Sequence, residues 1–178
     1  MWLRDRLPHD FKEVRSIIYG YDTRLLQSQS FQGIDDLALS FLAQLKSIGR
    51  ALKSAKPVVF LAHSLGGIVL KSTLLEMANS GDVGEFMLSS VRGVLLFGVP
   101  NKGMEISHWL PMVHDQPNAA MVQLLSPGSP VLVDLDQRFS GISTIRNLRL
   151  VSFYETERSR TAEVSKRIPR ARYTFLTR

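Results

Sequence analysis

The stretch VVFLAHSLGGIVLKSTLLEM, residues 58–77, carries the pattern that decides the fold. Apolar residues fill it up to His63, which predicts a fully buried strand over 58–63. After Ser64 come Gly66 and Gly67, and the apolar run that follows is long enough for a helix over 65–79. The sequence therefore predicts a strand, a sharp turn at Ser64 and a helix, which is how many hydrolases present a nucleophilic serine.

The turn matches the pattern G-x-S-x-G except at its first position, where Ala62 stands. Small residues are needed there because a bulky side chain would collide with the neighbouring strand or helix. We expect strained backbone at Ser64, and a Leu65 N–H that stabilises an oxyanion at the positive end of the helix dipole. His63 is expected to pack or orient beside the serine. The alternative is an incidental serine in a buried strand-turn-helix.

The rest of the chain alternates strands with helices. Further strands are expected at 14–21, 91–98 and 148–154, and helices at 33–54, 118–125 and 130–139. Strands that are apolar throughout predict an α/β fold, a parallel sheet with helices on both faces. We expect one α/β domain over 1–157, with its sheet incomplete at both ends, and a basic, poorly ordered tail over 158–178.

A serine nucleophile needs an acid and a histidine, which follow later strands in hydrolases with this turn. Glu155 stands at the end of the strand at 148–154, in the position of the acid; the alternative is a surface glutamate beside Glu157. No histidine follows Glu155, and the orthodox base is therefore missing. The four histidines all come earlier, at His9, His63, His108 and His114. Only 13 residues precede the first expected strand, the usual source of the second oxyanion-hole N–H.

Composition excludes several other chemistries. The chain has no cysteine, which rules out disulfides and thiolate chemistry, and we expect neither a cofactor nor a metal. No apolar run approaches the roughly 20 residues of a membrane-spanning helix, and a cytoplasmic protein is the expectation. Residues 158–178 carry seven Lys or Arg against one acid, which accounts for the whole net charge of +6. Without a binding motif, we expect a solvated tail and no nucleic acid partner.

Five blocks in order resemble a known family: WLRDRLP, IIYGYD, VFLAHSLGGIVLKSTL, LLFGVPNKGM and SFYET. They are similar to the serine-active-site esterase/lipase-like α/β-hydrolases of fungi, which often precede NACHT or repeat domains. Animal serine-active-site-containing proteins of mitochondria and the endoplasmic reticulum are similar too. The resemblance covers about residues 2–157. It implies an α/β-hydrolase fold, Ser64 as nucleophile, Glu155 near the acid, an ester or lipid substrate, and membrane association in either organelle as a second location.

The chain departs from that family at three points. The family usually has a His-Gly turn upstream, a histidine where Asn101 stands, and a downstream Asp-His pair that carries the base. These departures predict a truncated chain with impaired activity. Two functions compete: a serine hydrolase that acts on carboxylic esters or lipids, and a non-catalytic module that acts by binding. The sequence indicates no particular protein partner.

Overall fold

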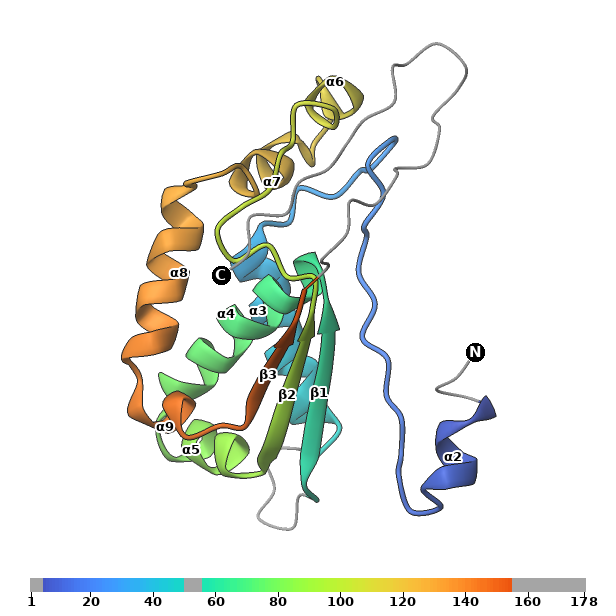
Figure 1. The fold of residues 1–178 in the computed structure, drawn as a ribbon, viewed down its shortest axis with the longest axis vertical. Coiled ribbons are helices and arrows are strands. Elements are labelled where there is room, and N and C mark those ends of the chain that lie inside the picture. Colours follow the sequence, from blue (N-terminus) through green and yellow to red (C-terminus); the bar gives the residue numbers. More distant parts are fainter. Residues whose placement is uncertain (1–4, 50–55, 155–178) are drawn as a thin grey trace.

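The computed structural model describes residues 5–49 and 56–154, in which the longer helices lie to one side of a small sheet (Figure 1). The strands are β1 (Val58–His63), β2 (Val91–Phe97) and β3 (Leu150–Phe153). The longer helices are α3 (Ile34–Ser47), α4 (Leu65–Ala78), α5 (Gly81–Ser89) and α8 (Pro130–Gly141). Shorter helices are α2 (Leu7–Asp10), α6 (Leu110–Val113), α7 (Ala119–Leu124) and α9 (Ser143–Arg146).

The three strands form one parallel sheet in the order β1-β2-β3. His63 at the end of β1 lies opposite Phe97 at the end of β2, and Phe97 lies opposite Phe153 at the end of β3. The carboxyl ends of all three strands therefore meet at one edge of the sheet, and Ser64 follows β1 at that edge. The expected parallel pairing of 58–63 with the strand that starts at residue 91 is confirmed.

Helix α4 forms the centre of the core. It packs against β1, α3, α5 and α8; ten of its 14 residues are buried and none is exposed, which explains why apolar residues occur around most of its circumference. Hydrogen bonds support its packing on α3: the Thr73 hydroxyl donates to the Ala38 carbonyl (3.4 Å) and the Ser72 hydroxyl to the Asp35 carboxylate (3.2 Å). The position of Ser64, just before α4, is therefore fixed by the best-packed element of the described chain.

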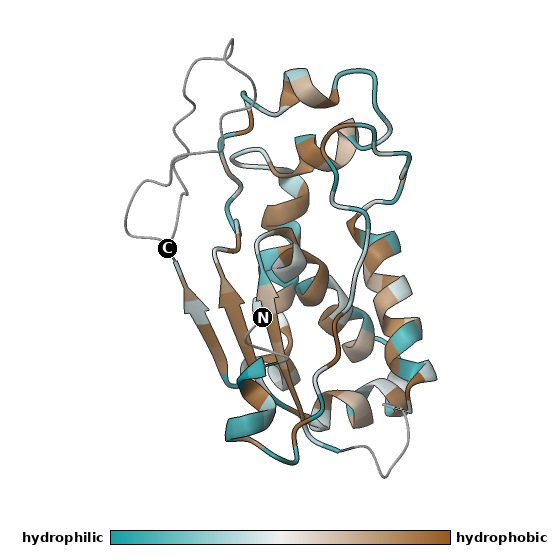
Figure 2. Cartoon of the chain, turned by 90° about the vertical axis from the view of Figure 1, so that its right-hand side faces the viewer, coloured by the Kyte–Doolittle hydropathy of each residue, from teal (hydrophilic) through white to brown (hydrophobic). Residues whose placement is uncertain are grey.

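Within the described residues, the two faces of the sheet differ in how far they are exposed. Phe60, Val94 and Leu96 point into the core, whereas Val59 and Leu61 on the other face of β1 are 50% and 49% exposed. Figure 2 shows the largely hydrophobic strands at one margin of the molecule, with the helices gathered to one side. Apolar strands indicate that both faces avoid water, but the pattern cannot tell which segment covers each face.

The expected strand at 14–21 is absent, because this segment joins none of the three strands. Three of its apolar side chains, Val14, Ile17 and Ile18, are exposed. Its inner end is held by Tyr19, whose ring stacks on Phe41 of α3 with ring centres 4.3 Å apart. The Tyr19 hydroxyl also donates to the Leu37 carbonyl (3.1 Å). β-branched residues favour extended backbone, but a strand also needs a partner with free hydrogen-bonding groups.

The helices agree better with the sequence. The expected helices at 65–79, 118–125 and 130–139 are α4, α7 and α8, while α3 ends at Ser47. Helix α4 ends at Ala78, shortly before Ser80 and Gly81 as expected, but Gly81 is already the first residue of α5. Gly84 allows this close succession, because a β-carbon there would lie 1.8 Å from the Met77 carbonyl oxygen. The basic tail expected at 158–178 lies outside the described residues.

Candidate functional site

Ser64 is the single residue between β1 and α4, and its backbone is strained. Its φ of 50° and ψ of −128° are unusual for a residue that is not glycine. Two hydrogen bonds fix this turn: the Ser64 N–H donates to the Phe97 carbonyl (2.9 Å), and the Gly67 N–H donates to the Ser64 carbonyl (2.9 Å). Within the described part of the chain, the Ser64 hydroxyl makes no hydrogen bond. The turn thus leaves the hydroxyl available at the N-terminus of a buried helix.

The two glycines behind Ser64 have different surroundings. A β-carbon on Gly67 would lie 2.2 Å from a methyl group of Val99, which follows β2, and only glycine fits there. A β-carbon on Gly66 would lie 3.5 Å from the Tyr21 hydroxyl oxygen, an ordinary contact. Ala62, before the turn, is half-buried and packs against the core, so that its extra methyl group is accommodated.

A cavity of about 370 Å³ lies against this turn. His63, Ser64, Leu65 and Gly66 form one wall. The facing walls come from the loop 21–32 and from Trp109 together with the region of α7. Its volume falls in the range of small-molecule sites. The cavity brings together residues from five separate parts of the chain, and the half-buried Ser64 lies in the wall formed by the end of β1 and the start of α4.

The loop that faces Ser64 is held by a polar cluster that sequence reasoning missed. The Nε–H and Nη2–H groups of Arg24 each donate to the Asp22 carboxylate at 2.9 Å, and the Ser28 hydroxyl donates to it at 3.2 Å. The Asn118 side-chain amide donates to the carbonyls of Arg24 (2.8 Å) and Leu25 (3.1 Å). These bonds tie the loop to the start of α7. The signal was present in Asp22-Thr23-Arg24, a turn sequence that we interpreted only as the end of a strand.

Electrostatics in this loop follow from those contacts. The hydrogen bonds from Arg24 hold the pKa of the Asp22 carboxyl well below its usual range. The pKa of the Tyr21 hydroxyl is raised, chiefly by burial and then by the nearby Tyr19. Asp22 is therefore a fixed anion paired with a fixed cation, whereas Tyr21 keeps its proton and can act as a hydrogen-bond donor.

The structure brings only one of the histidines to the cavity. His63 lines it beside Ser64, with Nε2 3.9 Å from where a Gly98 β-carbon would lie. His108 and His114 are not among the lining residues, and the His114 ring contacts Asp115 at 2.7 Å. His9, near the N-terminus of the chain, contacts Asp10. Glu155 lies outside the described residues, one position beyond Tyr154, so that its role as acid stays a prediction.

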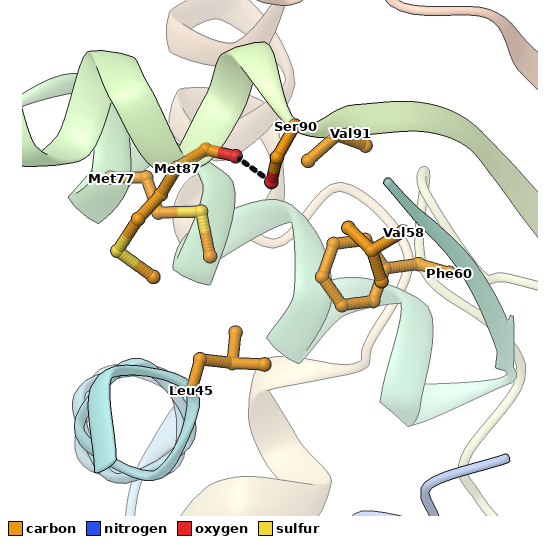
Figure 3. Close-up of a pocket in the computed structure, with 7 residues that line it drawn as sticks. All are labelled: Leu45, Val58, Phe60, Met77, Met87, Ser90 and Val91. Carbon is orange, nitrogen blue, oxygen red and sulfur yellow. Dashed lines mark hydrogen bonds between the residues drawn. The ribbon is translucent and has the colours of Figure 1, made fainter. Parts of the chain in front are cut away.

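A second cavity lies at the opposite edge of the sheet and has no catalytic character. It measures about 10 Å³ and is lined mainly by apolar side chains. Figure 3 shows Met77, Met87 and Leu45 around it, with the Ser90 hydroxyl hydrogen-bonded to the Met87 carbonyl (2.7 Å). A void of this size holds at most about one water molecule. It is a packing gap between helices and strand ends.

Neither a metal centre nor a membrane span is found in the described residues. Residues 5–49 and 56–154 contain no group of three or more His, Asp or Glu side chains placed to hold a metal ion. No helix in these ranges combines the length and hydrophobicity needed to cross a bilayer.

Comparison with known proteins finds relatives in sequence and a similar fold among solved structures. No family model matches it. It is 29% identical over 160 residues to Protein SERAC1 of Danio rerio, and 25% identical over 158 residues to Protein SERAC1 of Homo sapiens. Each alignment covers 87% of this chain but 24% of the relative. The chain thus spans about a quarter of the length of the curated relatives it matches.

Among solved structures, the phospholipase PlaB from Legionella pneumophila in complex with thio-NAD is similar, with a TM-score of 0.56 and 15% identity. The match covers 75% of this chain and 28% of that protein. At this level of identity the likeness concerns the fold alone. Together with the parallel sheet and its helices, it shows that the chain has the α/β-hydrolase-like fold that its sequence predicts.

Proposed function

We propose that this chain is a serine hydrolase-type domain of the esterase or lipase class, with the Ser64 hydroxyl as nucleophile toward a carboxylic ester or lipid. One observation carries the proposal: Ser64 has a φ of 50° in the one-residue turn between β1 and α4, beside a cavity of about 370 Å³. Strained backbone at residues other than glycine clusters at functional sites. The similarity to SERAC1 proteins and the phospholipase-like fold support the same class.

The chemistry follows from the location of the hydroxyl. The Ser64 Oγ attacks the carbonyl carbon of the ester, its proton passes to a base, and the carbonyl oxygen becomes an oxyanion. The Leu65 N–H, in the first turn of α4, stabilises that oxyanion together with the helix dipole. Collapse of the intermediate expels the alcohol and leaves an acyl-serine that water hydrolyses. Glu155 would orient the imidazole of a histidine base.

In this 178-residue chain, the group that would accept the Ser64 proton limits the expected rate of hydrolysis. No histidine follows β3 in the sequence, and His63 is the one described histidine at the cavity. Loss of the histidine from an intact triad lowers turnover by about 10⁶-fold. We therefore expect the chain as given to hydrolyse esters very slowly. The same observation favours a second candidate function, a pseudo-hydrolase module that binds an ester or lipid in the cavity without turning it over.

Chemical rescue separates these functions. Imidazole in solution can enter the cavity as a mobile base and take the proton from Ser64. Without imidazole, the chain and Ser64→Ala should hydrolyse p-nitrophenyl butyrate at the same low rate. With imidazole, we expect the chain to exceed Ser64→Ala by about 10-fold or more.

The remaining outcomes each decide a point. Equal rates for the two proteins at every imidazole concentration would contradict the nucleophile and leave the binding module. Strong turnover without imidazole that Ser64→Ala abolishes would contradict the impairment and identify His63 as the group to replace next. A fluorophosphonate probe gives an independent reading, because it labels only an activated serine.

A further inference from the structure

The hydroxyl of Tyr21 lies at the first turn of α4, where Ser64 also lies. Its oxygen is the nearest atom to a β-carbon built on Gly66, at 3.5 Å, and Gly66 is two residues beyond the serine. Tyr21, Ser64, Leu65 and Gly66 all line the same cavity. Within the described residues, the Tyr21 hydroxyl makes no hydrogen bond. The Tyr21 hydroxyl is thus a hydrogen-bond donor without a partner, and it lies beside the N-terminus of α4, next to Ser64.

The surroundings of Tyr21 hold its ring in place. On one side, the Tyr19 ring lies 5.7 Å from that of Tyr21 and is itself stacked on Phe41 and bonded to the Leu37 carbonyl. On the other side, Asp22 is fixed by Arg24 and Ser28. A hydroxyl positioned from both sides loses little freedom when it binds a ligand, which is what an effective donor requires.

We propose that the Tyr21 hydroxyl is a second hydrogen-bond donor to the carbonyl oxygen of an acyl group at Ser64, alongside the Leu65 N–H. This inference rests on the proposed function. As the bond from Ser64 Oγ to the carbonyl carbon forms, the π electron pair moves onto the oxygen, and Tyr21 donates a hydrogen bond to it without giving up its proton. Burial raises the pKa of Tyr21, which keeps the hydroxyl protonated under alkaline conditions.

A side-chain hydroxyl can occupy the position that a second backbone N–H occupies in other oxyanion holes. In hydrolases with this turn, that second N–H comes from a loop that follows an early strand. Tyr21 belongs to the described loop that faces Ser64, so that its hydroxyl can take that place from the same side of the cavity. It would act as a catalytic residue, because it touches the reacting oxygen, and its effect should grow as negative charge develops there.

The test uses butylboronic acid, which forms a tetrahedral adduct with an active-site serine and needs no turnover. The Ser64 Oγ bonds to boron, the Oγ proton passes to the buffer, and the trigonal boron becomes a tetrahedral anion that carries two hydroxyl groups. Boron-11 NMR identifies the adduct, and a titration gives its Kd. Three variants are compared with the parent chain: Ser64→Ala, Tyr21→Phe, and Tyr154→Phe as the matched control, since Tyr154 is exposed and does not line the cavity.

We expect the parent to form the adduct and Ser64→Ala to lose it. Tyr21→Phe should raise the Kd by about 10- to 100-fold, since a hydrogen bond to a charged group is lost. Tyr154→Phe should change it by less than about twofold. An unchanged Kd in Tyr21→Phe, with the adduct present in the parent, would overturn the role of Tyr21 and leave Ser64 intact. Absence of the adduct in the parent would overturn both assignments.

Discussion

Gly66 and Gly67 are neighbours in the sequence, yet only one of them is required by packing. A methyl group at Gly67 would lie 2.2 Å and 2.8 Å from the two methyl groups of Val99, whose branched side chain has little freedom to move away. A methyl group at Gly66 meets nothing closer than 3.5 Å. The G-x-S-x-G pattern explains small residues around the serine in general, but the contacts decide which of them matters to the fold.

We expect Gly67→Ala to lower the free energy of unfolding by about 1–3 kcal/mol, because it overpacks the contact with Val99. Gly66→Ala should leave stability unchanged or raise it by up to about 1 kcal/mol, since alanine favours the helix. Urea denaturation measures both. The double variant Gly67→Ala/Val99→Ala removes the two shortest contacts and leaves one at 3.1 Å, and an alanine at position 67 that costs as much beside Val99→Ala as beside Val99 would contradict this explanation.

Asp22 provides a pH dependence with a definite sign. Its pKa is lowered in the folded chain by Arg24, so that its stabilising effect is fully present above the pKa of an unfolded Asp, about 3.9, and is lost as the pH falls toward the lowered value. Asp22→Asn should therefore be less stable than the parent near neutral pH, and the difference should shrink below about pH 4.

Thermal unfolding of the two proteins across that pH range checks the prediction. Asp134→Asn is the control, because Asp134 forms an exposed pair with Arg138 one helical turn away. A gap between Asp22→Asn and the parent that stays constant down to about pH 2 would show that Asp22 acts through something other than its charge.

Among the elements, the contact between α4 and α8 depends on a buried cation. The Lys71 side chain is 8% exposed, and its ammonium group lies 3.2 Å from the Asp136 carboxylate and 5.0 Å from the centre of the Phe139 ring. Burial lowers the pKa of Lys71, with Asp136 opposing the shift. The folded chain therefore binds this proton less tightly than the unfolded chain, and stability should rise with pH as the lysine loses its proton.

We expect Asp136→Ala to be clearly destabilising, because it leaves a buried ammonium group with one partner fewer. Lys71→Met should be close to neutral, or stabilising, because an apolar side chain of similar length fills the same space. Lys71→Met should also flatten the rise in stability between about pH 8 and about pH 10. Guanidinium denaturation at both pH values tests these points, and Lys71→Met as destabilising as Asp136→Ala would refute the account.

The elements also show where sequence reasoning succeeds and where it stops. The strand at 58–63 and the helices at 65–78 and 130–141 follow from local patterns, and so does the strained turn at Ser64. The segment 14–21 has equally strong strand composition but no partner strand, which is a tertiary property. The cavity depends on hydrogen bonds between Asn118 and the carbonyls of Arg24 and Leu25, some 93 residues away, and no local pattern carries that information.

At the scale of the whole molecule, the sheet has one face in the core and one face that the described residues leave exposed. The exposed face carries Val59, Leu61 and Phe153, and the Phe153 ring stacks on that of Phe97 with ring centres 4.6 Å apart. Contiguous apolar patches of this kind promote association. The helices lie together on the other face, which makes the described molecule two-layered.

We expect Leu61→Thr to reduce self-association without lowering the melting temperature, because Leu61 is 49% exposed and threonine keeps the preference for strand. Val94→Thr, on the buried face, should instead destabilise by about 1–3 kcal/mol, since it buries a hydroxyl group. Light scattering against concentration and a thermal melt measure the two properties separately. Equal destabilisation by both changes would mean that the face of Leu61 is covered in solution.

The φ of 50° at Ser64 also determines which substitutions should accumulate at this position when the gene is mutated and selected. Glycine adopts such backbone without strain, whereas serine there costs on the order of 1–3 kcal/mol, so that Ser64→Gly should melt at a higher temperature than the parent. In a mutagenised library selected only for foldedness, codon 64 should therefore move toward glycine. In a library selected for a task that needs the hydroxyl, serine should persist. The residue retained at position 64 therefore indicates whether the selected task requires the serine hydroxyl.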